Sequence, residues 1–155
     1  MIAQLTQSLA DRLSLAQYTD AYPTIVAKQS YLPQYDNEQM GALKVSVLPR
    51  EVEIQKTGRA AEQHDYTLAI VLAKRTDGSP EQVDELLALV ERMCDLLRSD
   101  AMPPSEDYPW PAEAKWWALA LEPVWSQEHL EERRIFFTAI QVQYRAILPH
   151  VETQE

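Results

Sequence analysis

The sequence predicts an α+β fold in which a mostly antiparallel sheet of about five strands carries two main helices on one face. Residues 66–73 are apolar on both alternating faces, which is typical of a strand that is covered on both sides. Residues 2–16 and 83–97 instead repeat apolar side chains at helical steps. A length of 155 residues fits one domain, so we expect residues 1–155 to form a single unit with a flexible tail from about residue 149.

The N-terminal segment predicts an amphipathic helix over residues 2–16. Its apolar positions recur at three- and four-residue steps: Ile2, Leu5, Leu9 and Leu13. Residues 24–31 lie between two X-Pro sites and are expected to be extended, because proline pushes the preceding residue out of the helical region. The polar residues 34–40 are expected to form a loop or one helical turn.

A hairpin is predicted between residues 43 and 73. Residues 43–48 and 52–55 are strand-like, and residues 49–51 interrupt them. Pro49 lacks the N–H that a ladder needs, so it predicts a bulge or an edge. Residues 56–59 predict the tip of the hairpin, which returns through residues 60–63 into the central strand.

The second helix has a strong start signal. Ser79 can cap it, Pro80 suits its first position, and Gln82 completes a Ser-x-x-Gln capping box. The predicted buried face holds Val83, Leu86, Leu87, Val90, Met93, Cys94 and Leu97.

The C-terminal third predicts two more strands. Residues 101–114 form a proline-rich acidic loop, residues 115–121 a strand, and Ser126 can cap a short turn over residues 127–130. Residues 134–148 predict a long final strand, with one face apolar through Phe136, Ile140, Val142, Tyr144 and Ala146. The other face turns polar, so we expect half of it to meet solvent or a partner. Its apolar half and the sheet edges are expected to need cover from loops or another subunit.

Composition excludes several classes of function. The net charge of −10 and pI of about 4.7 argue against binding the outside of nucleic acid by phosphate neutralisation. The single Cys94 predicts no intramolecular disulfide and no cysteine-based metal site, which fits a reducing compartment. The N-terminus lacks the pattern of a signal peptide and no apolar run approaches ~20 residues, so we expect a soluble protein with no membrane contact.

No residue pattern predicts catalysis, and we expect no catalytic residue, cofactor or metal ion. His64 and Asp65 are neighbours on a strand, so their side chains should point to opposite faces. Glycine-rich phosphate loops and nucleophile motifs are absent from the sequence. The four tryptophans are expected to pack in the core or an interface, with a sugar-stacking platform as the alternative. The rings of Trp116 and Trp117 should lie on opposite faces, one inward and one outward.

The chain resembles the small tail terminator, or tail completion, proteins of long-tailed bacteriophages. The segments that carry the resemblance are Tyr31-Leu32-Pro33, residues 43–50, His64-Asp65-Tyr66, the helix of residues 86–97 and residues 121–144, closed by Tyr144-Arg145. The resemblance implies a homo-hexameric ring that stops tail-tube polymerisation and joins the tail to the head connector, without chemistry. It implies the tail tube protein and the head connector as partners, DNA passing through the lumen without specific binding, and a place in the virion and, during assembly, in the host cytoplasm.

The predicted exposed sheet surfaces and the resemblance to tail terminators together suggest candidate interface residues. The hairpin tip with Lys56, Arg59 and nearby Arg50 is expected to dock against the tube or a neighbouring subunit, and the alternative is a solvated turn. Further candidates are Trp110, Gln141, Gln143 and Arg145. Two other functions stay open: a neck protein one layer nearer the head, and a glycan-binding module that uses an exposed Trp110 or Trp116. A small enzyme ranks behind them.

Overall fold

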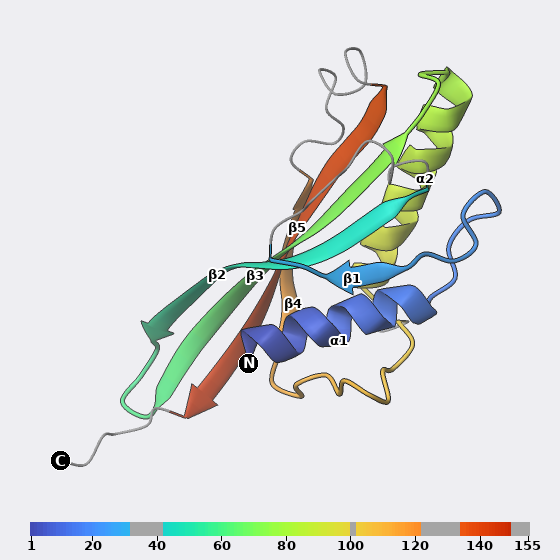
Figure 1. The fold of residues 1–155 in the computed structure, drawn as a ribbon. Coiled ribbons are helices and arrows are strands. Elements are labelled where there is room, and N and C mark those ends of the chain that lie inside the picture. Colours follow the sequence, from blue (N-terminus) through green and yellow to red (C-terminus); the bar gives the residue numbers. More distant parts are fainter. Residues whose placement is uncertain (32–41, 100–101, 122–133, 150–155) are drawn as a thin grey trace.

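The computed structural model describes residues 1–31, 42–99, 102–121 and 134–149. The elements in chain order are α1 (Ile2–Leu15), β1 (Ala27–Gln29), β2 (Lys44–Lys56), β3 (Ala61–Arg75), α2 (Pro80–Leu97), β4 (Lys115–Leu121) and β5 (Ile135–Pro149). The strands form one sheet in the order β1-β2-β3-β5-β4, in which only the β1–β2 pair is parallel. Both helices lie on one side of this sheet (Figure 1), so the predicted α+β class is confirmed.

Element boundaries differ from the prediction mainly near the N-terminus. The first helix ends at Leu15, and the extended segment 24–31 contributes only the short strand β1. The acidic segment 102–114 holds no helix or strand among its described residues, as predicted. The predicted loop at residues 34–40, the turn capped by Ser126 and the tail beyond Pro149 lie outside the described residues.

The two strand-like segments 43–48 and 52–55 form one continuous strand, β2. Its register against β3 shifts between Pro49 and Glu51, which confirms the predicted bulge. β1 pairs with β2 only at residues 45–47. Within the described chain, the rest of β2 therefore has β3 as its only strand partner, so its other edge is open. Pro49 is tolerated at this edge because its missing N–H leaves no hydrogen bond unmade there.

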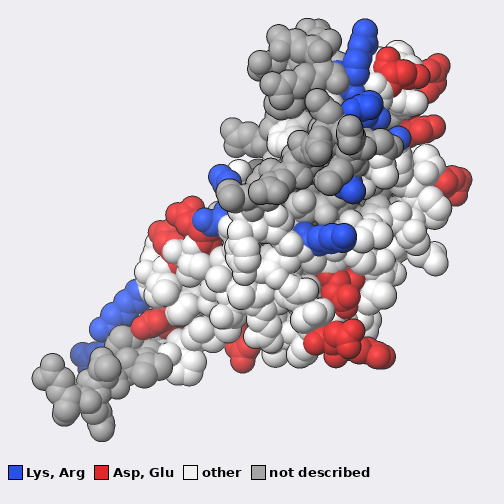
Figure 2. Space-filling view, in the orientation of Figure 1, with Lys and Arg blue, Asp and Glu red and all other residues white. Residues whose placement is uncertain are grey.

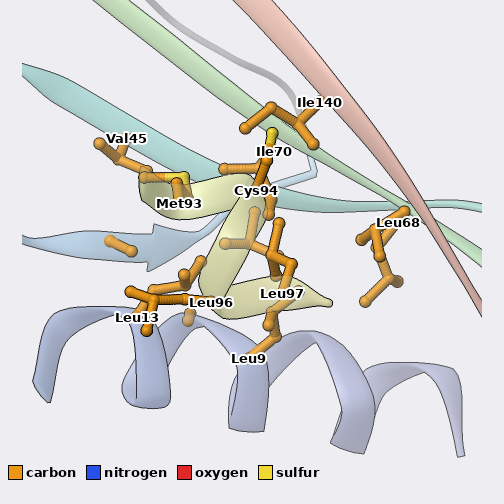
Figure 3. Close-up of a cluster of buried hydrophobic side chains, with 14 of the residues drawn as sticks. Leu9, Leu13, Val45, Leu68, Ile70, Met93, Cys94, Leu96, Leu97 and Ile140 are labelled. Atoms are coloured by element: carbon orange, nitrogen blue, oxygen red, sulfur yellow. The ribbon is translucent and has the colours of Figure 1, made fainter. Parts of the chain in front are cut away.

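The main core lies between the two helices and the face of the sheet that they cover, hereafter the helix face. Leu9 and Leu13 of α1, Met93 and Leu97 of α2 and Ile70 of β3 all belong to this core (Figure 3). β5 contributes the buried side chains Phe136, Ile140, Val142 and Ala146. The central strand is thus covered as predicted, because its helix-face residues form the middle of this core.

The opposite, outer face of the sheet also has a buried apolar half. The buried residues are Leu48, Ala69, Val71, Ala73 and Ile135. We expected this apolar surface to need cover from loops or from another subunit. These side chains are already buried within a single chain, so the exposed apolar side chains of the sheet lie elsewhere.

The start of α2 differs in detail from the predicted capping box. Ser79 Oγ accepts the hydrogen bond of the Gln82 N–H (3.4 Å), as predicted. The Gln82 side chain, however, accepts from the Asp77 N–H (3.0 Å), because the Ser79 N–H already donates to Asp77 Oδ1 (2.8 Å). Leu89 and Leu96 also join the buried face, whereas the predicted Val83 and Leu87 are only partly buried.

Candidate assembly surface

The sheet continues beyond the layer covered by the helices. The hairpin arm, defined as residues 51–65, extends with the end of β5 away from both helices (Figure 1). On its helix face, Val52 and Ile54 are 41% and 57% exposed, and on the outer face of the adjoining β5 end Ile147 is 54% exposed. The projecting end of the sheet therefore offers apolar side chains on both faces.

The tip of the arm is basic. Lys56 and Arg59 are exposed there, and the Thr57 N–H donates to the Ala61 carbonyl (3.1 Å) to close the turn. Figure 2 shows Lys and Arg side chains at this projecting end of the molecule. The tip residues predicted from the sequence thus lie together on a free, protruding turn.

Arg50, which was expected near this tip, lies away from it. It is exposed at the bulge between Pro49 and Glu51, six residues before Lys56. At ~3.3 Å per residue, this separation is about 20 Å along the strand. A contact made by the tip would therefore not include Arg50.

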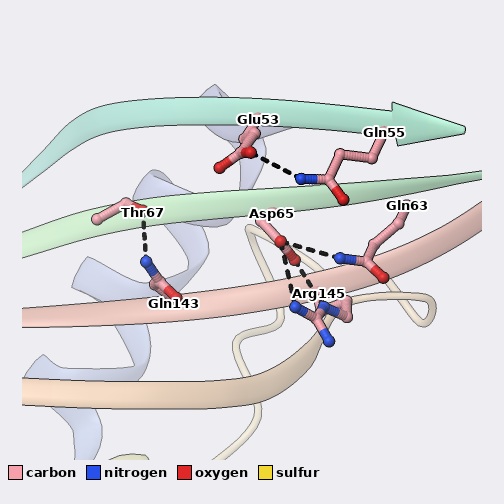
Figure 4. A network of polar contacts seen from close by, with 7 residues as sticks. All are labelled: Glu53, Gln55, Gln63, Asp65, Thr67, Gln143 and Arg145. Atoms are coloured by element: carbon pink, nitrogen blue, oxygen red, sulfur yellow. Dashed lines mark hydrogen bonds and ion pairs between the residues drawn. The ribbon is translucent and has the colours of Figure 1, made fainter.

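Three predicted interface residues of β5 share the outer face. Gln141, Gln143 and Arg145 lie opposite residues 69, 67 and 65 of β3, respectively. Arg145 donates to Asp65 through Nε (2.7 Å) and Nη2 (3.3 Å), and Gln143 Nε2 donates to Thr67 Oγ1 (3.4 Å) (Figure 4). Arg145 and Gln143 thus each bond to the residue of β3 that lies opposite.

Arg145 has a second partner on the same face. Its guanidinium carbon lies 3.5 Å from the ring centroid of Trp117. Gln63 Nε2 also donates to Asp65 Oδ2 (3.1 Å). Arg145 is therefore held by a carboxylate and an aromatic ring of its own chain, and these contacts help to order this end of the sheet.

The ion pair predicts a measurable pH dependence. The hydrogen bond from Arg145 lowers the pKa of Asp65, whose side chain is 16% exposed. Because the pKa is lower in the folded state, the pair stabilises the fold above the unfolded pKa of about 4, and this stability is lost as the pH falls through the folded pKa. In urea titrations at pH 7, Asp65→Asn should lower the free energy of unfolding by about 1–2 kcal/mol. The variant should also lose less stability than the wild type between about pH 4 and pH 2, and an equal loss would contradict this role for Asp65.

Trp110 lies on the other side of the sheet from these polar residues. Its ring packs edge-on against Tyr144 (4.8 Å between centroids) and under the Arg12 guanidinium (4.9 Å), and its Nε1–H donates to the Ala114 carbonyl (3.0 Å). Trp110 and Tyr144 line a cavity of about 610 Å³ together with Trp116. The predicted interface residues therefore do not form one surface, because the sheet separates Trp110 from the β5 set.

The paired tryptophans are placed on opposite sides of the sheet, as predicted. Trp116 lines the helix-face cavity, whereas Trp117 contacts Arg145 on the outer face. Trp116 thus points to the helix side and Trp117 to the outer face, although neither residue is buried, since they are 42% and 53% exposed. A register shift between Trp116 and Ala118, which the sequence pattern did not indicate, lifts this part of β4 out of regular pairing.

The side chains of His64 and Asp65 are hydrogen-bonded, and that of Cys94 is buried. His64 contacts the Tyr66 hydroxyl through Nδ1 and Glu62 through Nε2 (both 3.0 Å), while Asp65 faces the other way, as predicted. Burial raises the pKa of the Cys94 thiol. The parts of the chain that the structure describes contain no cluster of three His, Cys, Asp or Glu side chains that could hold a metal ion. None of the helices described is long and apolar enough to cross a membrane.

Comparison with known protein families finds no matching family, and comparison with curated proteins finds no matching sequence.

Proposed function

We propose that this protein is a phage tail terminator, which caps the tail tube as a homo-hexameric ring, ends tube polymerisation and joins the tail to the head connector. The observation that supports this proposal best is the hairpin arm. The arm extends past the core, exposes Val52 and Ile54, and ends in the basic residues Lys56 and Arg59. Exposed apolar side chains grouped on a projecting element are typical of a surface that binds another protein.

Ring closure needs two different surfaces on each subunit. In a closed ring, one surface of each copy contacts another surface of the next copy. The arm supplies one such surface, and the exposed strand β4 at the opposite edge of the sheet offers a second. The molecule therefore has the asymmetry that head-to-tail association requires.

The charge of the chain is compatible with a ring around DNA. A net charge of −10 makes non-specific adhesion of DNA unfavourable, so DNA could slide through the lumen without specific binding. The tip is positively charged although the chain as a whole is negatively charged. Its charge is complementary to an acidic surface of the tube protein, the head connector or another copy. The protein would then act in the virion, after assembly in the host cytoplasm, and would perform no chemistry.

Light scattering after size-exclusion chromatography tests the proposal directly. Rings of about six subunits, or monomers that form rings only on tail-tube tips, are expected. A ring that binds the head connector but does not bind tubes would instead identify a neck protein. A stable monomer that binds sugars, for example through the exposed Trp116, would overturn the structural role.

Arg59→Glu tests the contribution of the arm. Arg59 is exposed on the turn, so circular dichroism should show an unchanged fold. Reversing its charge should weaken docking at least ~10-fold, equivalent to ~1.4 kcal/mol, and thereby reduce the yield of completed, infectious particles. Arg92→Glu, which changes an exposed arginine on α2, is the matched control and should have little effect. Normal particle yields from Arg59→Glu would remove the tip from the docking surface.

A further inference from the structure

We propose that the sheet of one copy continues into the sheet of the next, with the open edge of β4 paired to the open edge of β2 beyond its bulge. This inference rests on the ring assembly proposed above and names the contact that closes the ring. It follows from the strand order, the strand directions, the register and the charges at the two edges.

Both edges are open in the described chain. β1 pairs with β2 only at residues 45–47, so residues 49–56 of β2 pair with β3 alone. β4 is the last strand at the other side of the sheet and pairs with β5 alone. Unpaired strand edges present rows of N–H and C=O groups, which are templates for a further strand.

The strand directions are compatible with this pairing. β2 is antiparallel to β3, β3 to β5, and β5 to β4. β4 therefore runs in the direction opposite to β2. A neighbouring copy in the same orientation, as in a ring, offers its β4 antiparallel to β2 and keeps its helices on the same face of the extended sheet.

The register places complementary residues opposite each other. One row on the outer face runs across the four strands through Glu53, Asp65, Arg145 and Lys115. The next row, on the helix face, runs through Val52, Tyr66, Tyr144 and Trp116. If the sheet continues in the same register, Lys115 of one copy lies opposite Glu53 of the next, and Trp116 lies opposite Val52.

The outer-face row has an acidic residue at one end and a basic residue at the other. Its exposed ends are Glu53 at the β2 edge and Lys115 at the β4 edge. A β2-to-β4 contact thus joins opposite charges, whereas β2-to-β2 or β4-to-β4 contacts would join like charges. On the helix face, the same contact covers the half-exposed Val52 and Trp116. Charge therefore selects the head-to-tail contact, and apolar burial supports it.

The two charged residues do not contact each other within one chain. They are separated by three strand spacings of ~4.8 Å, about 14 Å in total, which is far beyond ion-pair distance. An energetic coupling between positions 53 and 115 would therefore report a contact between copies.

Charge reversal tests the contact. Glu53→Lys and Lys115→Glu each place like charges at every junction, and each should weaken assembly at least ~10-fold, measured by light scattering or by ring formation on tail tubes. The double variant restores opposite charges at every junction and should assemble like the wild type. A 1:1 mixture of the two single variants should also assemble, because alternating copies give opposite charges at each contact.

Controls separate this inference from the proposed function. Glu85→Lys, an exposed charge reversal on α2, should assemble like the wild type, and circular dichroism should show all variants folded. The defects of the single variants should shrink at high salt. Single variants that assemble normally, or a double variant and mixture that stay defective, would overturn the edge pairing while leaving ring assembly intact. A wild-type protein that assembles neither alone nor on tail tubes would overturn both.

Discussion

Replacing Phe136 with alanine should lower the free energy of unfolding by about 3–5 kcal/mol. Phe136 is 1% exposed and belongs to the core between the helices and β5. Truncating its ring removes apolar surface from that core and leaves a cavity that the surrounding strands can only partly fill. Since domains are stable by about 5–15 kcal/mol, this change should bring the protein close to unfolding at ambient temperature.

The neighbouring Phe137 is the matched control. It is only partly buried and packs against Ala73 and Ile135 on the outer face. Phe137→Ala should lower the free energy of unfolding by only about 1–2 kcal/mol. Part of the Phe137 ring is already exposed to water, so the substitution removes less buried apolar surface than Phe136→Ala does. Urea unfolding followed by circular dichroism gives both values, with similar m-values expected. Equal costs at the two positions would show that the helix face is not the dominant core.

Replacing Ile54 with lysine should leave the monomer as stable as the wild type but abolish most of its assembly. Ile54 is more than half exposed on the hairpin arm, so its side chain contributes little to the fold. If the arm is a contact surface, burying Ile54 would stabilise each junction by about 1–2 kcal/mol, and a lysine there would add the cost of desolvating its charge. Repeated at every junction of a ring, the loss should exceed ~10-fold in assembly constant.

Concentration-dependent light scattering and electron microscopy of tail tubes measure this effect. Val26→Lys provides the control, because Val26 is also an exposed apolar residue but lies before β1, away from the arm. An Ile54→Lys variant that forms rings at wild-type concentrations would exclude the helix face of the arm from the interface.

Local patterns were sufficient for most of the elements. Alternation in residues 66–73, helical spacing from Leu5 to Leu13 and the Ser79-Pro80 start signal each predicted an element that the structure contains. These signals work because strand and helix periodicity and capping depend on residues close in the chain. The bulge at Pro49 was predictable for the same reason, since the missing N–H is a property of that one residue.

Long-range pairing was not predictable in this way. Asp65 and Arg145 are 80 positions apart, and nothing local indicates that β3 and β5 place them side by side. The same applies to the cavity beside Trp110, which brings residues of α1, α2, β4 and β5 together. The sequence could therefore name candidate interface residues, but it could not say which of them share a surface.

The amino-acid sequence by itself determined the class of fold, the covered central strand and the limits of the second helix, because these follow from side-chain periodicity and caps. Only the tertiary structure decided which strand edges stay open and which charges lie in one row. Local signals predicted the hairpin of β2 and β3, because a short turn connects these strands. They carry no information about the pairing of β3 with β5 or of β1 with β2, because these strands are distant in the chain.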